Sequence, residues 1–207
     1  MNSLPPPSPS PFDRSEQRRL RSIKILQVAA EMFNKKGFGG TSLEDVAAEL
    51  KISKASIYNY FENKQSLLFH VYLRAFELTA IASERAEQQE GSGLDRLVTF
   101  ITTQVELMLD PDHGPVAVLS ETSSLTPEDR QTIQAMARRQ DERVRAFIEQ
   151  GMRDGSIRAE NATRVEFLIM GMLNWIPKWF HIGGEWTKND ISASVVQMIV
   201  HGIGAPQ

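Results

Sequence analysis

A short stretch of the chain carries four side chains that can hydrogen-bond to a nucleic acid. Lys54, Ser56, Tyr58 and Asn59 offer an ammonium, a hydroxyl, a phenol and a carboxamide within six residues. A carboxamide can bind an adenine edge with two hydrogen bonds, and an ammonium can bind guanine or a phosphate. The serine hydroxyl can contact a base edge or a phosphate, and the tyrosine can touch a thymine methyl group or a phosphate. This set of groups predicts contacts to DNA bases and to the DNA backbone.

The flanking residues predict two short helices, joined by a tight turn, that would hold this set out to a partner. Thr41 is placed to cap the first helix, and Glu44 three residues later can complete a capping box. Ser53 is placed to cap the second helix, on which Ile57 and Phe61 would point inward, one turn apart. A helix this short is not stable alone, so its neighbours must support it. The arrangement is typical of a helix-turn-helix that enters the major groove with the N-terminus of its second helix.

Three segments in this region resemble the N-terminal domain of the tetracycline-repressor (TetR) family. They are residues 37–42 (GFGGTS), residues 46–47 (VA) and residues 52–67 (ISKASIYNYFENKQSL). Two positions depart from the commonest family pattern: Ala55 stands where glycine is usual, and Asn59-Tyr60 stand where a histidine or tyrosine pair is frequent. Both departures fit a helix. They bear on the operator sequence and not on the DNA-binding role that the resemblance implies.

Phosphate contacts are expected where the first short helix and the following long helix begin. Hydroxyls and free amides at Thr41 and Ser42 can bind a phosphate at a helix start. The resemblance, which covers roughly residues 15–70, implies that Lys64 contacts the DNA backbone. Tyr60 could either contact DNA or pack in the hydrophobic core of this domain, and Phe61 is expected to pack in that core.

A basic cluster is expected to lie beside these residues on the first helix. Arg18, Arg19 and Arg21 are close to its start, where a cation is unfavourable. We therefore expect them to contact phosphates, with a solvated helix start as the alternative. The complete set of predicted DNA contacts is Arg18, Arg19, Arg21, Thr41, Ser42, Lys54, Ala55, Ser56, Tyr58, Asn59, Tyr60 and Lys64.

Composition excludes several other classes of function. The 207 residues are 41% hydrophobic and contain no cysteine, which rules out disulfide scaffolds and cysteine-based zinc sites. The four histidines are far apart, and the sequence has no GxSxG, HExxH or glycine-rich phosphate loop. We therefore expect no enzyme activity, no cofactor and no metal site. No apolar run reaches the length of a membrane span and the start lacks a signal-peptide pattern, so a cytoplasmic protein is expected.

The charged residues are distributed unevenly along the chain. Residues 13–74 contain 11 Lys and Arg and 7 Asp and Glu, a net charge of +4. The remaining residues contain 12 Lys and Arg and 19 Asp and Glu, a net charge of −7. A basic N-terminal part and an acidic remainder suit a protein that meets a polyanion at one end, although chance segregation of solvated charges could produce the same imbalance.

The hydrophobic periodicity predicts an all-α chain of about nine helices. A disordered, proline-rich tail is expected over residues 1–13, so that no helix would start before Phe12. An N-terminal three-helix helix-turn-helix DNA-binding domain would follow over residues 14–62, and a C-terminal helical bundle for effector binding and dimerisation over residues 63–207. Outside the two short helices, the predicted helices lie at about 15–36, 64–89, 94–109, 127–153, 161–180 and 188–203. Residues 116–124 could form either a helix or a loop. Pro177 is expected to kink the helix in which it lies.

The last two helices are predicted to form a homodimer interface. Residues 161–180 and 188–203 are more apolar than one core face requires. In the TetR family the last two helices commonly pair with those of a second copy as a four-helix bundle, and a two-fold dimer is what a palindromic operator requires. The alternative is that both helices pack inside the monomer.

The remaining helices of the bundle are predicted to enclose a small-molecule effector, as the resemblance implies. Bulky, adaptable side chains are the candidates, although a plain core is the alternative for each. Residues 171–184 also resemble TetR-family members that control lipid or acyl-CoA catabolism, which suggests a hydrophobic or acyl-thioester effector. The candidate ligand-binding residues are Phe100, Met108, Met136, Phe147, Met172, Trp175 and Trp179.

Four arginines of the bundle, Arg138, Arg139, Arg143 and Arg145, could attract phosphates of such a ligand, with a solvated helix face as the alternative. The sequence as a whole predicts a ligand-responsive, homodimeric repressor of double-stranded DNA. Two alternatives remain: an architectural or activating DNA-binding protein without an effector, and a protein-interaction module that uses the same fold without DNA.

Overall fold

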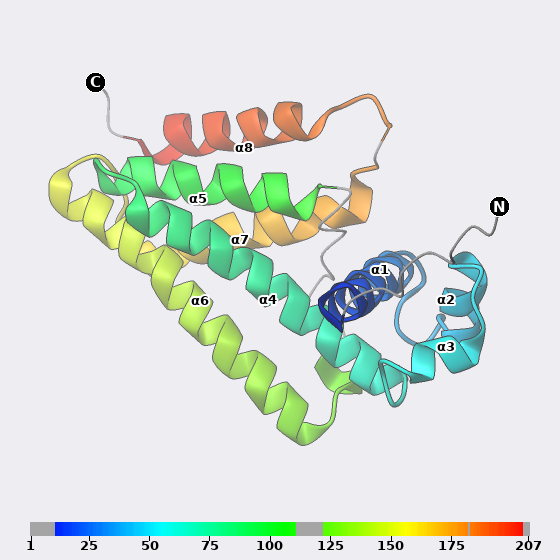
Figure 1. Cartoon of the computed structure of the whole chain (residues 1–207). Coiled ribbons are helices and arrows are strands. Elements are labelled where there is room, and N and C mark those ends of the chain that lie inside the picture. Colours follow the sequence, from blue (N-terminus) through cyan, green and yellow to red (C-terminus); the bar gives the residue numbers. More distant parts are fainter. Residues whose placement is uncertain (1–10, 111–121, 182, 205–207) are drawn as a thin grey trace.

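The computed structural model describes residues 11–110, 122–181 and 183–204. Within these ranges the chain forms eight α-helices, one 3-10 turn and no strand longer than an isolated bridge between Ile157 and Gly204, so the all-α prediction is confirmed (Figure 1). The elements are α1 Pro11–Lys36, α2 Leu43–Glu49, α3 Lys54–Tyr58, α4 Lys64–Gln88, α5 Gly93–Met108, η1 Thr122–Ser124, α6 Pro127–Asp154, α7 Ala162–Trp179 and α8 Lys188–Ile203.

Capping residues set most helix boundaries where the sequence predicts them. Ser53, Asn63, Thr126 and Asn161 each accept a hydrogen bond from the backbone N–H three residues later, which satisfies one of the unpaired donors of the first turn. Gly155 ends α6 with a φ of 81°, a left-handed conformation that glycine adopts without strain.

The start of α1 differs from the prediction. Helix α1 begins at Pro11, four residues before the predicted start and inside the predicted tail. Proline is accepted in a first turn because its missing N–H would have no helical partner there. The rest of the predicted tail, residues 1–10, lies outside the described residues. For residues 116–124, where the sequence did not decide between a helix and a loop, residues 116–121 also lie outside them, and residues 122–124 form η1.

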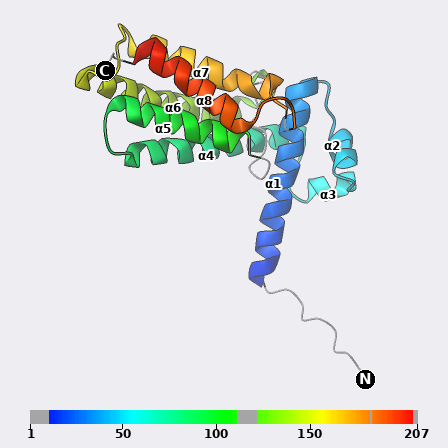
Figure 2. The ribbon, with the colours of Figure 1, turned by 90° about the horizontal axis from the view of Figure 1, so that it is seen from above.

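Helices α2 and α3 pack beside α1 at one end of the molecule, and α4 leads from them into a bundle with α5, α6, α7 and α8 (Figure 1). Seen from above, α1 projects away from this bundle (Figure 2). We call α1, α2, α3 and the first half of α4 the head, and the remaining helices with the second half of α4 the body.

Each part has its own buried cluster, and α4 belongs to both. Leu67, Val71 and Phe76 of α4 pack in the head cluster, together with Leu125, which precedes α6, and Ile133 of α6 itself. Further along the same helix, Ala82 and Ala86 pack in the body cluster. Helix α4 is one continuous helix and therefore connects the two clusters directly.

Pro177 lies inside α7, and the helix continues past it to Trp179. The proline lacks the N–H that would bond to the carbonyl of Leu173. Among the described residues, no helix is both long and apolar enough to span a membrane.

Candidate nucleic-acid interface

Helix α3 turns one side chain into the head and the others outward. Ile57 is 0% exposed and anchors the helix in the head cluster. Tyr58 and Asn59 are exposed on the opposite side, as is Ala55. Lys54 and Ser56, in the first turn, are half-buried. The helix therefore offers a polar surface that is held in place from behind by one buried isoleucine.

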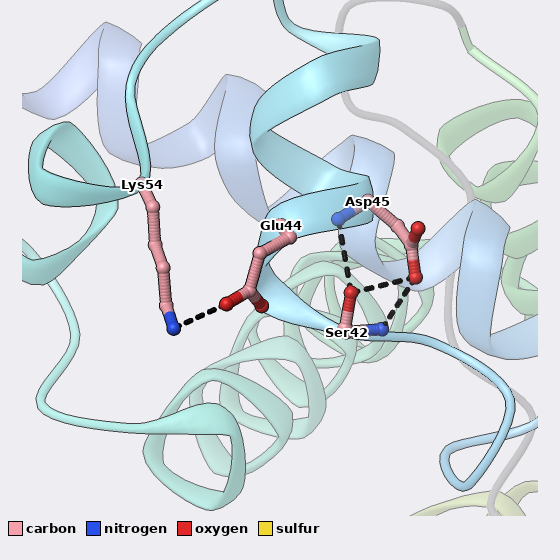
Figure 3. Close-up of polar contacts among 4 residues, drawn as sticks. All are labelled: Ser42, Glu44, Asp45 and Lys54. Carbon is pink, nitrogen blue, oxygen red and sulfur yellow. Dashed lines mark hydrogen bonds and ion pairs between the residues drawn. The ribbon is translucent and has the colours of Figure 1, made fainter.

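The cap of α2 lies one residue later than predicted. Ser42, not Thr41, is the N-cap, and Asp45, not Glu44, completes the capping box (Figure 3). The Ser42 hydroxyl accepts from the Asp45 N–H at 3.1 Å, and the Ser42 N–H donates to the Asp45 carboxylate at 2.8 Å. The Ser42 hydroxyl also donates to the Asp45 carboxylate at 2.7 Å, and this bond, together with the one from the Ser42 N–H, holds the pKa of Asp45 below its usual value. Both pairs in the sequence satisfy the capping-box spacing, so spacing alone could not separate them.

Burial explains why Thr41 does not cap. Its side chain is 1% exposed, and its hydroxyl donates to backbone carbonyl oxygens of the head, at 3.0 Å to Gly37 and 3.3 Å to Met32. These bonds fasten the turn between α1 and α2. The Thr41 hydroxyl is therefore engaged within the head, and its contact with a phosphate stays a prediction.

Lys54 is paired within the head. Its ammonium forms an ion pair with the Glu44 carboxylate across the turn between α2 and α3 (Figure 3), and it lies 5.5 Å from the centre of the Tyr58 ring. The hydrogen bond to Glu44 raises the pKa of Lys54 and lowers that of Glu44. The Lys54 side chain is 42% exposed and that of Glu44 60%, so water screens this pair, which is weak and can be exchanged for a phosphate.

Lys64 fastens the start of α4 to the turn between α1 and α2. Its ammonium donates to the carbonyl oxygens of Phe38 at 2.8 Å and Thr41 at 2.9 Å, and lies 4.1 Å from the centre of the Phe38 ring. An ammonium has three N–H donors, so these two bonds leave one that can reach a phosphate.

The three arginines of the predicted basic cluster have different surroundings. The Arg18 guanidinium donates to the Asn59 carbonyl oxygen at the end of α3, at 3.1 Å, and lies 5.7 Å from the centre of the half-buried Tyr60 ring. Arg19 pairs with Glu16 on its own helix at 2.7 Å. Arg21 is exposed and lines a shallow basic pocket with Arg18 and Tyr60. Arg18 thus ties α3 to α1, a role that the spacing of the cluster did not reveal.

The candidate ligand-binding residues do not surround one space. Phe100 and Phe147 are buried and pack on each other, with ring centres 6.5 Å apart. Met136 packs against the head cluster and Met172 against the body cluster. Trp175 is 62% exposed and Trp179 is 39% exposed, both on the outer face of α7. Met108 is buried and lines an interior cavity.

That cavity lies among α4, α5, α6 and α7 and has a volume of about 50 Å³. Several polar side chains line it, among them Gln104, Gln140, Asp141 and Asn174. The Gln104 Oε1 atom is buried and has no hydrogen-bond partner among the described residues. A cavity of this size holds a few water molecules. The sequence prediction missed these residues because it sought apolar side chains at helical spacing.

A buried carboxylate close to the cavity was also missed. Glu166 of α7 is 0% exposed, and the Arg145 guanidinium lies 3.3 Å from its Oε2 atom. Burial raises the pKa of Glu166 above its usual value, and the nearby Asp141 carboxylate adds to the effect. Burial likewise raises the pKa of Asp141. Among the described residues, no group of three or more acidic or histidine side chains could hold a metal ion.

Comparison with known proteins gives matches over nearly the whole chain. The family model described as "Tetracyclin repressor-like, C-terminal domain" matches residues 90–203, and the model "Bacterial regulatory proteins, tetR family" matches residues 25–71. The repressor KstR2 of Rhodococcus jostii (strain RHA1) is 26% identical over 205 residues, which cover 96% of this chain and 98% of KstR2.

Solved structures of similar proteins share the fold. The regulator PfmR from Thermus thermophilus is 27% identical, with a TM-score of 0.73 over 88% of this chain and 99% of PfmR. AibR in complex with isovaleryl coenzyme A and operator DNA is 28% identical, with a TM-score of 0.71 over 86% of this chain and 97% of AibR.

Proposed function

The chain belongs to the tetracycline-repressor (TetR) family of transcriptional regulators, and from this premise we propose that it is a homodimeric repressor released from a palindromic operator by a small effector. The outward surface of α3, anchored by the buried Ile57, is the observation that carries the proposal. Its polar groups stand where a recognition helix contacts base edges. Regulators with full-length similarity to this chain, such as KstR2, support the same function.

In the proposed complex, α3 enters the major groove. Ser56, Tyr58 and Asn59 contact base edges, with Ala55 close to the bases. Lys54 exchanges its Glu44 partner for a phosphate or a guanine. Ser42, Arg19, Arg21, Tyr60 and Lys64 lie around α3 and make backbone contacts, while Arg18 positions the end of the helix.

The proposed dimer forms through α7 and α8. Leu168 and Trp175, two turns apart on α7, are 71% and 62% exposed, and Met198 of α8 is also exposed. Exposed apolar side chains gathered in this way mark an interaction surface. A second copy with the same two helices would cover them and place two heads on one two-fold axis. Sedimentation of the Leu168→Glu variant should show a monomer where the unchanged chain is a dimer; a dimer in both cases contradicts this interface.

The proposed effector is hydrophobic or an acyl thioester. Support comes from AibR, whose structure contains isovaleryl coenzyme A together with operator DNA. In the proposed mechanism the effector binds among the body helices, displaces the second half of α4, and changes the separation of the two heads. Effector binding then weakens operator binding because the ligand prefers the DNA-free arrangement.

A titration of operator DNA in the presence and absence of acyl-coenzyme A thioesters tests induction. At least one member of a series that includes isovaleryl coenzyme A should lower operator affinity. Unchanged affinity at saturation with each bound thioester contradicts an acyl-thioester inducer.

A second candidate is an architectural or activating DNA-binding protein without an effector. The interior cavity of about 50 Å³ is well below the roughly 300 Å³ of ordinary ligand pockets, whereas a more open pocket between α1 and the ends of α5 and α7, about 730 Å³, is large enough for a ligand. Operator binding that no ligand alters would support this candidate. A protein-interaction role without DNA would instead give no steep, salt-dependent binding to any duplex.

A further inference from the structure

A groove on the outer side of the body collects four guanidinium groups from two helices. It lies where the end of α4, the start of α5 and the second half of α6 run side by side (Figure 1), and its volume is about 510 Å³. We call it the arginine groove and define it by Arg96 of α5 and by Arg139, Arg143 and Arg153 of α6, with Glu87 and Glu142 as its acidic members. The groove therefore has four cationic groups and two carboxylates, an excess of positive charge, although this part of the chain has a negative net charge.

Helical spacing explains how α6 supplies three of the arginines. The three arginines of α6 are four and ten residues apart, at positions 139, 143 and 153. Ala146 and Gln150 lie between them on the same face of the helix. Residues three and four apart share one face of a helix. Arg145, by contrast, lies on another face of α6 and pairs with Glu166. Of the four neighbouring arginines of α6 named in the sequence analysis, only Arg139 and Arg143 therefore belong to the groove.

A close backbone contact brings the fourth arginine to this face of α6. A Cβ atom on Gly93, the first residue of α5, would lie 2.0 Å from the Gly151 nitrogen of α6, so only glycine allows this approach. The Gly93 N–H also donates to the Asp154 carboxylate of α6 at 2.7 Å. Arg96 follows Gly93 by three residues and is thus held against α6.

The guanidinium groups of the groove are only partly neutralised. Arg143 donates to the Glu87 carboxylate at 2.8 Å. Arg139 and Arg153 form no hydrogen bond or ion pair with another described residue, and the Arg96 Nε atom is buried without a hydrogen-bond partner among them. The hydrogen bond from Arg143 lowers the pKa of Glu87, and the charges of Arg139 and Arg96 contribute, which indicates that all three cations converge on one carboxylate.

We propose that the arginine groove binds the phosphate groups of a small molecule. Guanidinium groups present planar pairs of N–H donors that match phosphate oxygens, and they remain charged at any physiological pH. The groove is shallow and open to solvent, so several of its guanidinium groups are accessible to phosphate oxygens. This proposal goes beyond operator binding and induction, since it assigns a second binding chemistry to the body. The phosphates can belong to a nucleotide-bearing ligand such as coenzyme A or to a free polyphosphate.

Calorimetric titration of the full chain, without DNA, tests the proposal with three probes. Inorganic pyrophosphate and coenzyme A carry phosphates, and pantetheine is the corresponding thiol without them. Coenzyme A, pyrophosphate or both should bind, and pantetheine should bind at least tenfold more weakly than coenzyme A. Binding of coenzyme A alone assigns the groove to a nucleotide-bearing ligand, and binding of pyrophosphate alone assigns it to free phosphates.

Two variants and one matched control locate the binding. Arg139→Gln removes an exposed guanidinium of the groove and should lower the affinity about tenfold, equivalent to about 1.4 kcal/mol. Arg96→Gln should act in the same direction. Arg138→Gln makes the same change one residue away, outside the groove, and should alter the affinity less than twofold.

Failure of both phosphate-bearing probes to bind would overturn the proposal. So would binding that neither Arg139→Gln nor Arg96→Gln weakens, or that Arg138→Gln weakens equally. Because no DNA is present, these outcomes leave the proposed operator binding untouched, and a failure of operator binding leaves the groove untouched.

Discussion

The head and the body bury different kinds of residue. In the head, most polar side chains lie on the surface or fasten turns, with Gln27 of α1 and the Arg74 Nε atom of α4 as buried exceptions, and the interior is formed mainly by apolar residues such as Ile57 and Phe61. In the body, Gln104, Gln140 and Glu166 are buried, and Gln104 and Glu166 each have a buried oxygen without a hydrogen-bond partner among the described residues. An unpartnered buried polar atom costs stability.

This difference suggests a division of labour along α4. A closed apolar interior keeps the shape of the head constant, as a surface that contacts DNA bases requires. The body interior contains two buried oxygens without a hydrogen-bond partner among the described residues, so a ligand that donates to them would remove this cost. This fits the proposed effector-binding body.

The largest expected effect comes from the head interior. Ile57→Ala should lower the free energy of unfolding by about 2–5 kcal/mol because it opens a cavity behind α3. Urea denaturation measures this change. Tyr58→Ala, on the exposed side of the same helix, is the control and should stay within about 0.5 kcal/mol while weakening operator binding. Equal destabilisation by the two variants would refute the assignment of inner and outer faces.

The next effect separates a positioning role from a phosphate contact. Arg18→Ala should weaken operator binding about tenfold because the end of α3 loses its bond to α1. If Arg18 only positions α3, the slope of log affinity against log salt should stay unchanged. A slope reduced by about one would identify a direct phosphate contact instead. Arg19→Ala is the matched comparison: it removes a proposed phosphate contact that pairs with Glu16, and it should lower that slope by about one.

The body interior should respond to pH through Glu166. Burial raises the pKa of this acid above its usual value of 4.5, so the folded state holds the proton more tightly than the unfolded state. The resulting stability is present below pH 4.5 and is lost as pH rises through the folded-state pKa. Glu166→Gln should therefore be more stable than the unchanged chain at pH 7, by about 1 kcal/mol, and the difference should vanish near pH 4.

Urea midpoints at the two pH values measure this effect. Glu149→Gln, on the exposed side of α6, should show no comparable pH dependence. A Glu166→Gln variant that is less stable than the unchanged chain at pH 7 would mean that the ion pair with Arg145 outweighs burial.

The smallest expected effect concerns the Lys54–Glu44 pair. Glu44→Gln releases Lys54 and should raise operator affinity about threefold at low salt, with the gain disappearing at high salt. Glu49→Gln removes a carboxylate from the same helix without touching Lys54. An equal gain in both variants would show that overall charge, not the pair, is responsible.

Much of the fold follows from local patterns in the sequence. Helical periodicity predicted the long helices, and the caps Ser53, Asn63 and Thr126 fixed three starts because a side-chain oxygen there satisfies an unpaired N–H. The start of α2 was predicted one residue too early, since two overlapping capping boxes satisfy the same spacing. Burial of Thr41 decides between them, and burial depends on how α1 and α2 pack.

The candidate sites were less predictable for the same reason. Sequence spacing placed Tyr58 and Asn59 outward correctly, because a five-residue helix has only one face to bury. It could not show that Arg18 and Lys64 bond to backbone carbonyl oxygens of the head, since those oxygens belong to residues 41 and 26 positions away. Their contacts with DNA stay predictions.

Selection of bound sequences from a random DNA pool tests the DNA-binding role of α3 most directly. The account predicts enrichment of a palindrome whose half-sites lie about one helical turn apart, or a multiple of it. The Asn59→Ala variant should lose its preference at one position in each half-site and keep the rest. Failure to enrich any sequence, or a preference that Asn59→Ala, Tyr58→Ala and Ser56→Ala all leave unchanged, would contradict the claim that α3 recognises the operator.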